Sequence, residues 1–202
     1  MSVLGTYFDK AAGAPEPGDE FLVTQARQGD RWAFEKLVKR YERPLYNYLR
    51  RMTGDPTDAE DVFQETFLKV YSHLNRFQEG RPFKPWLYRI ATNTARDFLR
   101  HKRRRPQVSL DDEDGARPSL LDTLAASLPS PSSLLASREN VERLEKAVAG
   151  LSEIHRAVFL LSRYEGLPYS EIAEVLDIPV GTVKSRMNKA VHELLDALKE
   201  TP

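Results

Sequence analysis

Four side chains between residues 86 and 105 recur at a spacing that would bring them into one row on a helix. Arg89, Asn93, Arg96 and Arg100 stand at i, i+4, i+7 and i+11, which is the spacing of one helical face. An Asn amide can hydrogen-bond base edges, and Arg side chains can hold phosphates. The segment carries seven Lys or Arg against one Asp. The row therefore predicts a helix that binds nucleic acid, with a solvated basic face as the plainer alternative.

Aromatic residues stand at and just before the start of this segment. Trp86 and Tyr88 belong to it, and Phe83 precedes it in the predicted loop NRFQEGRPFKP. Aromatic rings can stack on unpaired bases. We interpret the three as surfaces for unstacked bases, and the alternative for Trp86 is that it packs in the core.

A second helix, in the stretch DAEDVFQETFLKVY at 58–71, has two faces. At 100° per residue its core side gathers six positions, Val62, Phe63, Thr66, Phe67, Val70 and Leu74. The opposite side gathers Asp61, Gln64, Glu65 and Leu68. An acidic first turn that favours the helix dipole explains the carboxylates but leaves the exposed leucine unexplained. A docking surface for a basic partner explains both.

The C-terminal segment predicts a helix-turn-helix. A first helix capped by Ser170 carries Ile172, Ala173 and Leu176, DIPVG turns the chain, and a second helix follows from about Val180. The second helix would put Val183, Met187, Ala190 and Leu194 in the core. Its outer side would carry Ser185, Asn188, Lys189 and His192, flanked by Thr182, Lys184 and Arg186. No acidic residue occurs between Val180 and His192, so this helix suits the major groove of DNA better than a generic α-hairpin would require.

Composition excludes several classes of site. The chain has no cysteine, so disulfides, zinc ribbons and thiol nucleophiles are excluded. The four histidines, His73, His101, His155 and His192, lack the spacing of helical metal ligands. We find no cofactor-binding loop and no nucleophile with a partnered base, so we predict no metal, no cofactor and no enzymatic activity. With no leader and no long apolar run, the chain is expected to be cytoplasmic.

The remaining pattern predicts two small all-α domains. Of the 202 residues 41% are hydrophobic, and we divide them into a mobile tail (1–18), a first domain (19–105), an acidic Pro/Ser-rich linker (106–137) and a second domain (138–202). Asp19 and Asp30 are predicted as N-caps, and Thr57 with Glu60 as a capping box. Pro44 is expected to kink or restart its helix. No stretch alternates apolar and polar residues long enough for a strand.

Three segments in this order, DAEDVFQETFLKVY, RFQEGRPFKPWLYRIATNTARDFLR and YSEIAEVLDIPVGTVKSRMNKA, resemble the extracytoplasmic-function (ECF) group of bacterial sigma factors in the sigma-70 family. The resemblance spans roughly 19–105 and 138–198. It implies that the first domain (region 2) docks through the Asp61–Leu68 stripe on the β′ clamp helices of core RNA polymerase. The loop from Gln78 to Pro85 and the basic helix would open and read the minus-ten promoter element, with Asn93 touching a base.

The resemblance also implies that the second domain (region 4) reads the minus-thirty-five element with Ser185, Asn188 and Lys189 and contacts the β flap. Many relatives have Arg at positions 184 and 189 and an aromatic residue at 188, so promoter preference does not carry over. Many relatives are held by an anti-sigma factor, a partner that no residue here proves. A transcriptional repressor or activator remains the competing interpretation. It shares the helix-turn-helix but leaves the Asp61–Leu68 stripe unexplained.

Overall fold

A computed structural model describes residues 16–104 and 131–199, with side chains described in these ranges except for 131–140. Its described residues are helical, without a strand, which confirms the all-α prediction. The predicted tail (1–18) and linker (106–137) lie mostly outside the described residues. Within those residues, no helix combines the length and the hydropathy needed to cross a membrane.

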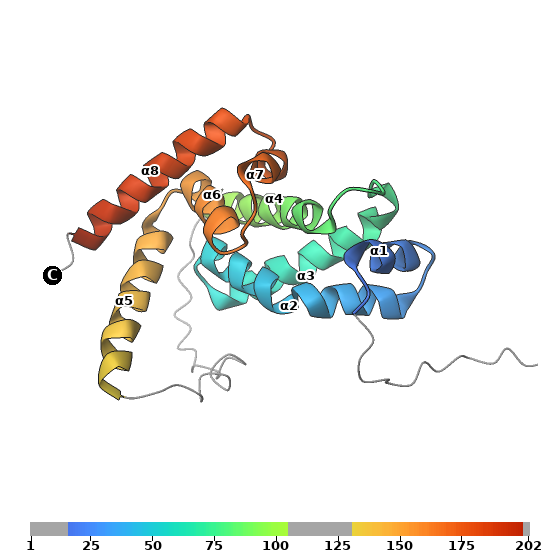
Figure 1. The fold of residues 1–202 in the computed structure, drawn as a ribbon, viewed down its shortest axis with the longest axis horizontal. Helices are drawn as coiled ribbons and strands as arrows, with labels where there is room; N and C mark the ends of the chain where they lie inside the picture. The colour runs from blue at the N-terminus through green and yellow to red at the C-terminus, as the bar shows by residue number, and fades with distance from the viewer. Residues whose placement is uncertain (1–15, 105–130, 200–202) are drawn as a thin grey trace, which may run out of the picture.

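The helices form two groups, coloured blue to green and yellow to red in Figure 1. The N-terminal group contains α1 (Asp19–Arg27), α2 (Arg31–Thr53), α3 (Pro56–His73), the short 3₁₀ helix η1 (Leu74–Arg76) and α4 (Phe83–Arg104). The C-terminal group contains α5 (Pro131–Gly150), α6 (Glu153–Arg163), α7 (Tyr169–Leu176) and α8 (Val180–Lys199). Because α5 begins at Pro131, the last residues of the predicted linker are helical.

Side-chain caps begin several of these helices, and some differ from prediction. Asp30 accepts hydrogen bonds from the backbone N–H groups of Trp32 (2.9 Å) and Ala33 (3.4 Å), which confirms it as the N-cap of α2. The capping box predicted at Thr57 and Glu60 was wrong. Asp55 caps α3 instead and accepts from the N–H of Asp58 at 2.9 Å, because Pro56 already takes the first helical position.

Two further cap predictions were wrong by one or two positions. Asp19 is the first residue of α1, after the N-cap Gly18. Ser170 is the second residue of α7, whose N-cap is Pro168. A carboxylate such as that of Asp19 suits both the cap and the first turn, where it favours the helix dipole, and the proline at 168 takes the cap position before Ser170.

Pro44 lies inside α2, which continues as one helix from Arg31 to Thr53. Of the two expected outcomes, a kink or a restart, the restart does not occur, since one proline removes a single N–H and the flanking turns keep theirs. The helix ends at Gly54, which has a φ of 82° and so takes the left-handed conformation that glycine adopts without strain.

The N-terminal core forms where α1, α3 and α4 pack around α2. Leu37, Leu45, Leu49 and Met52 of α2 are fully buried. The Tyr48 ring meets Tyr88 of α4 edge to face, with centroids 5.2 Å apart, and its hydroxyl lies 2.7 Å from Oγ1 of Thr92. This buried contact holds α4 in one orientation, so the outward residues of α4 are fixed as well.

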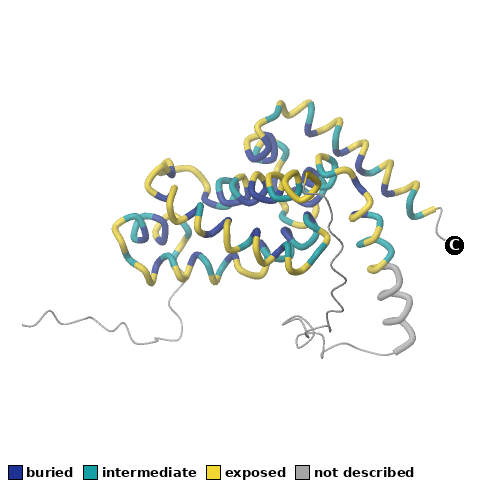
Figure 2. Tube along the Cα trace, turned by 180° about the vertical axis from the view of Figure 1, so that it is seen from behind, coloured by how far each residue is buried: buried dark blue, intermediate teal, exposed yellow. Residues whose placement is uncertain are grey.

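The C-terminal core lies among α6, α7 and α8. Val158, Leu160, Leu161 and Ile172 are fully buried, and Val183 of α8 packs with them. The tube in Figure 2 shows buried positions alternating with exposed ones along each helix, as amphipathic helices require.

The two groups pack against each other. The most extensive contact between them is that of α7 with α4, and α2 also contacts α5 and α6. Regions far apart in sequence therefore share one surface, and this arrangement answers a question that the sequence left open, namely how the two domains are oriented.

Candidate protein and nucleic-acid interfaces

The outer face of α3 lies where the sequence predicted it. Asp61, Gln64, Glu65 and Leu68 are all exposed, and Leu68 shows 72% of its surface. On the opposite side Val62, Thr66, Phe67 and Val70 are buried, with Phe63 partly buried beside them. One side of α3 is therefore packed in the core. The opposite side faces solvent and combines acidic and apolar side chains.

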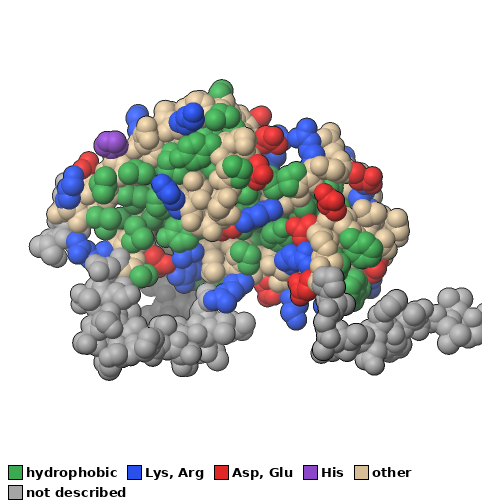
Figure 3. Space-filling view, viewed as in Figure 1, with side chains coloured by type: hydrophobic (Ala, Val, Ile, Leu, Met, Phe, Trp, Pro, Cys, Tyr) green, Lys and Arg blue, Asp and Glu red, His purple; other side chains and the backbone are tan. Residues whose placement is uncertain are grey.

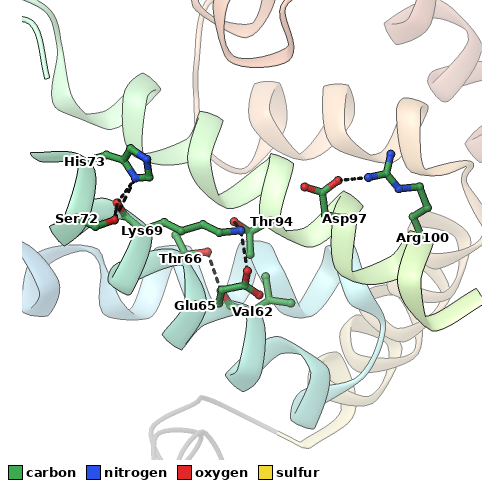
Figure 4. Close-up of polar contacts among 9 residues, drawn as sticks. All are labelled: Val62, Glu65, Thr66, Lys69, Ser72, His73, Thr94, Asp97 and Arg100. Carbon is green, nitrogen blue, oxygen red and sulfur yellow. Dashed lines mark hydrogen bonds and ion pairs between the residues drawn. The ribbon is translucent and has the colours of Figure 1, made fainter. Parts of the chain in front are cut away.

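Lys69 modifies this face in a way that the sequence analysis missed. Its Nζ lies 2.7 Å from Oε1 of Glu65 and donates to Oγ1 of Thr94 on α4 at 3.2 Å, as Figure 4 shows. The i, i+4 spacing of Glu65 and Lys69 was the available signal. The pair joins the outer face of α3 to the helix that carries the basic row.

Tyr71 extends the same face and was also missed. It is 62% exposed and stands three residues after Leu68, so it lies one turn further along α3. Its ring packs edge to face against Phe34 of α2, with centroids 5.1 Å apart. Leu68 and Tyr71 thus form a small exposed apolar patch on the outer face of α3.

The basic row of α4 is exposed along its length. Arg89, Asn93, Arg96 and Arg100 all face solvent. Arg100 pairs with Asp97 at 2.8 Å (Figure 4). Lys102, beyond the row, pairs with Asp58 of α3 at 2.7 Å, and the hydrogen bond to Asp58 raises the pKa of Lys102. The row therefore offers three guanidinium groups and one amide on a single helix face.

Two of the three aromatic residues assigned to base stacking lie in the core. Phe83 is 2% exposed and Tyr88 is fully buried. Phe83 is the first residue of α4 and not part of the loop, and its ring packs against Phe77 and Trp86 at 5.9 Å and 5.7 Å. Neither ring presents a face to a base in this arrangement. Trp86 is partly buried and keeps an accessible side.

A hollow of about 320 Å³ opens beside Trp86. The N-terminal group of helices forms one side of the hollow, with the loop after η1 and the start of α4. Glu174 and Val175 of α7 form the other side. The lining includes Arg76, Phe77, Gln78, Arg81, Pro82, Pro85, Trp86 and Arg89. The combination of cationic side chains with aromatic and proline surfaces suits a base and its phosphates.

Glu165, in the turn between α6 and α7, makes a buried contact with α4 that no sequence signal indicated. Its side chain is 7% exposed and accepts a hydrogen bond from the Tyr88 hydroxyl. Lys84 Nζ donates to the backbone carbonyl of Glu165 at 2.6 Å and lies 3.7 Å from its Oε2. Burial raises the pKa of Glu165, and the hydrogen bond from Tyr88 and the positive charge of Lys84 oppose that rise.

The helix-turn-helix forms as predicted in α7 and α8. The turn passes through Asp177, which has a φ of 53°, and α8 buries its predicted core positions, Val183, Met187, Ala190 and Leu194. Lys184, Ser185, Asn188 and Lys189 are exposed, and Thr182 and Arg186 are partly exposed. The outer face of α8 therefore presents small polar and basic side chains together.

Two family models match this chain. Sigma-70 region 2 matches residues 37–105, and sigma-70 region 4 matches residues 141–198. The first match covers the outer faces of α3 and α4, and the second covers the helix-turn-helix.

Similar proteins of known bacteria agree with these models. The chain is 35% identical to the RNA polymerase sigma-H factor of Pseudomonas aeruginosa, over 90% of this chain and 94% of that one. It is 33% identical to the ECF RNA polymerase sigma factor SigW of Bacillus subtilis, over 88% of this chain and 95% of that one.

Solved structures show the same fold. The structure of CnrH in complex with the cytosolic domain of CnrY matches with a TM-score of 0.66 and 28% identity, covering 91% of this chain and 99% of that chain. The sigma factor RpoE of Bartonella quintana, in complex with the anti-sigma factor NepR, matches with a TM-score of 0.63 at 22% identity, over 84% and 98% of the two chains. The latter likeness concerns the fold alone.

Sigma factors are transcription initiation factors and have no enzymatic step of their own. Three observations lead to one conclusion. The chain folds into two helical domains, it matches both sigma-70 regions, and its relatives align along most of their length. The chain belongs to the ECF group of the sigma-70 family, whose members direct promoter-specific transcription initiation.

Proposed function

We propose that the outer face of α3 is the surface that binds core RNA polymerase, on the β′ clamp helices. The exposed Leu68 and Tyr71 supply apolar area, and Asp61 and Glu65 supply negative charge for a basic partner. Such a combination favours a specific protein contact, because the apolar side chains contribute affinity and the charges contribute orientation and association rate.

The minus-ten element is read by α4 and by the loop before it. Asn93 hydrogen-bonds a base edge, while Arg89, Arg96 and Arg100 hold the phosphates of the same strand. An unstacked base enters the hollow beside Trp86, the aromatic residue of the original three that keeps an accessible side. Phe83 and Tyr88 act from the core, where they position the start of α4.

The minus-thirty-five element is read by α8 in the major groove. Ser185, Asn188 and Lys189 face the bases, with Thr182, Lys184 and Arg186 beside the phosphates. Region 4 also meets the β flap of polymerase through an apolar surface on α5 and α8. Val141 and Leu195 are 53% and 50% exposed there, and Figure 3 shows hydrophobic side chains gathered over this end of the molecule.

The energetics of melting require polymerase as a partner. Opening about ten base pairs forfeits stacking of about 1.4 kcal/mol per step, or about 14 kcal/mol in total. Capture of one or two bases returns about 1 to 3 kcal/mol each. The deficit means that this chain reads a promoter only within the holoenzyme.

We further propose a cytoplasmic factor that serves a stress or envelope response and is held inactive by an anti-sigma protein. The support comes from the names of similar proteins and from the partner in one solved complex. CnrH was solved with the cytosolic domain of CnrY, and several relatives are named ECF factors.

The observation that carries the proposal is the arrangement of three outward helix faces, α3, α4 and α8, on one chain that matches both sigma-70 regions. Footprinting on duplex promoter DNA tests it. Protection over both promoter elements is expected with chain and core polymerase together. Equal protection by the chain alone would instead favour a repressor or activator.

A further inference from the structure

The hollow proposed to receive an unstacked base is closed on one side by the chain's own region 4. Glu174 and Val175 of α7 form that side, opposite Trp86 and Arg89 of α4. A DNA strand that enters the hollow would therefore contact α7 or displace it.

The charges across this boundary are complementary. The loop and the start of α4 contribute the cations Arg76, Arg81, Lys84 and Arg89. From region 4, the Glu174 carboxylate lies 3.5 Å from Arg81, and the Glu165 carboxylate lies 3.7 Å from Lys84. Two carboxylates of region 4 thus neutralise cations that would otherwise be available to phosphates.

Glu165 is the anchor of this contact. α6 ends at Arg163, and Gly166, which follows Glu165 with a φ of 69°, takes the left-handed conformation in the turn that leads to α7. The carboxylate is buried and held by the Tyr88 hydroxyl and Lys84. A buried, charge-assisted contact contributes more than an exposed pair such as Arg81 with Glu174.

A second set of contacts supports the same packing at the other end of the interface. The Arg51 guanidinium of α2 lies 4.3 Å from the centre of the Tyr164 ring and 3.2 Å from Oε1 of Glu145. Arg156 of α6 donates to the backbone carbonyl of Met52 at 2.8 Å. These contacts are all made between the two groups of helices of this chain.

From this geometry we propose that region 4 is an intramolecular competitor of the minus-ten strand: Glu165 anchors α7 over the hollow, and Glu174 occupies the cationic site of a phosphate. The inference rests on the proposed function of the hollow. The outer row at Asn93, Arg96 and Arg100 stays exposed, so competition is confined to the loop and the start of α4. The hollow can then hold either single-stranded DNA or the side chains of α7, but not both.

Closure weakens DNA binding by an amount that depends on the fraction of molecules in the open state. The apparent dissociation constant equals the intrinsic one divided by the fraction of open molecules. Loss of one buried, charge-assisted contact shifts such an equilibrium by about tenfold or more. A variant that opens the interface is therefore expected to bind a single strand about tenfold more tightly.

The test uses the full chain in two measurements. The chain has no cysteine, so dyes can be placed at cysteines introduced for the exposed Gln28 and Ser170, one in each domain, to report closure by energy transfer. Fluorescein-labelled oligothymidine, whose bases stack without sequence preference, reports strand binding by anisotropy. The open variant combines Glu165→Ala with Glu174→Arg, and Glu165→Ala alone is a milder second variant that leaves Glu174 in place.

Glu171→Ala provides the matched control. Glu171 lies on the same helix as Glu174 and makes no ion pair within the part of the chain that the structure describes. This variant should match the unmodified chain in both measurements.

The proposal expects energy transfer to fall in the open variant, oligothymidine to bind about tenfold more tightly, and excess oligothymidine to lower energy transfer in the unmodified chain. Equal oligothymidine affinity of the unmodified chain and an opened variant would overturn the competitor while leaving the DNA-binding role in place. Absence of binding by every variant would overturn the DNA-binding role of the hollow, and the competitor with it.

Discussion

The hydroxyl of Tyr88 on α4 donates a hydrogen bond to the carboxylate of Glu165 in the turn after α6. The two residues are far apart in sequence and belong to different sigma regions. Tyr88 is fully buried and also packs on Tyr48, so the contact connects the core of region 2 directly to region 4. The packing of the two regions against each other therefore includes a buried carboxylate.

A pH dependence of closure follows from this contact. Burial raises the pKa of Glu165 above its ordinary value of 4.5, against the opposing effects of Tyr88, Lys84 and Arg51. The closed arrangement therefore binds the Glu165 proton more tightly than the open one does. Its stabilisation is complete below the ordinary pKa and is lost as pH rises through the raised pKa.

Energy transfer between the dyes at positions 28 and 170 should consequently increase as the pH falls from neutral toward the ordinary pKa of 4.5. Glu165→Gln should remove that change, because an amide does not titrate. An identical pH profile in both proteins would show that another group is responsible.

Arg156 predicts a stability effect that involves both domains. Its guanidinium donates to the carbonyls of Val148 (3.2 Å), Leu151 (2.9 Å) and Met52 (2.8 Å), and also to Ala149. It therefore satisfies carbonyl groups at the C-terminal ends of α5 and α2. Arg156→Ala should lower the free energy of unfolding by about 2 kcal/mol.

Urea denaturation followed by circular dichroism measures this loss. Arg163→Ala is the control, since Arg163 is an exposed arginine at the end of the same helix. A comparable midpoint for both variants would mean that the hydrogen bonds of Arg156 contribute little.

Periodicity predicted the faces of the helices well because burial follows helix geometry. The outer rows of α3, α4 and α8 depend only on a regular helix with one buried side, and the structure has them as expected. The cap of α3 was harder to predict, since Asp55, Thr57 and Asp58 are all plausible cap residues and only the backbone distinguishes them.

The errors at Phe83 and Tyr88 have a different cause. An aromatic residue beside a basic row suits both a core and a base-stacking surface, and the helix register at its first turn decides between them. The Glu165 contact was beyond sequence reasoning, because a glutamate in a Gly-containing turn carries no signal of a distant partner. Packing between two domains depends on how their folded surfaces fit together, and the helical periodicity of the sequence does not report that fit.

The outer face of α3 can be tested by two substitutions of different character. Leu68→Ala removes exposed apolar area and should weaken core polymerase binding about tenfold at any salt concentration. Glu65→Lys should weaken it about fivefold at low salt and less at high salt, because the loss is electrostatic.

Fluorescence anisotropy of labelled chain titrated with core polymerase gives both affinities. Glu35→Lys, an equal charge reversal at an exposed position of α2, is the control and should bind normally. If Leu68→Ala and Glu65→Lys also bound normally, the polymerase surface would have to lie elsewhere.

On α4, base reading and phosphate binding should separate. Asn93→Ala should reduce discrimination at one minus-ten position by about 1 to 3 kcal/mol, with little change in the salt dependence of binding. Arg96→Ala should weaken all sequences similarly and reduce the salt slope by about 1. Competition between minus-ten sequences in holoenzyme binding measures both, with Arg43→Ala on α2 as an arginine control. The same loss of sequence discrimination in Arg96→Ala as in Asn93→Ala would contradict this division.

The central claim is that α3, α4 and α8 act together to direct core polymerase to promoters. Run-off transcription on a pool of genomic promoter fragments with purified core polymerase tests it most directly. Defined transcripts should appear only when the chain is present, and Leu68→Ala, Asn93→Ala and Asn188→Ala should each reduce them. Transcripts that are the same with and without the chain, or that all three variants leave unchanged, would contradict the account.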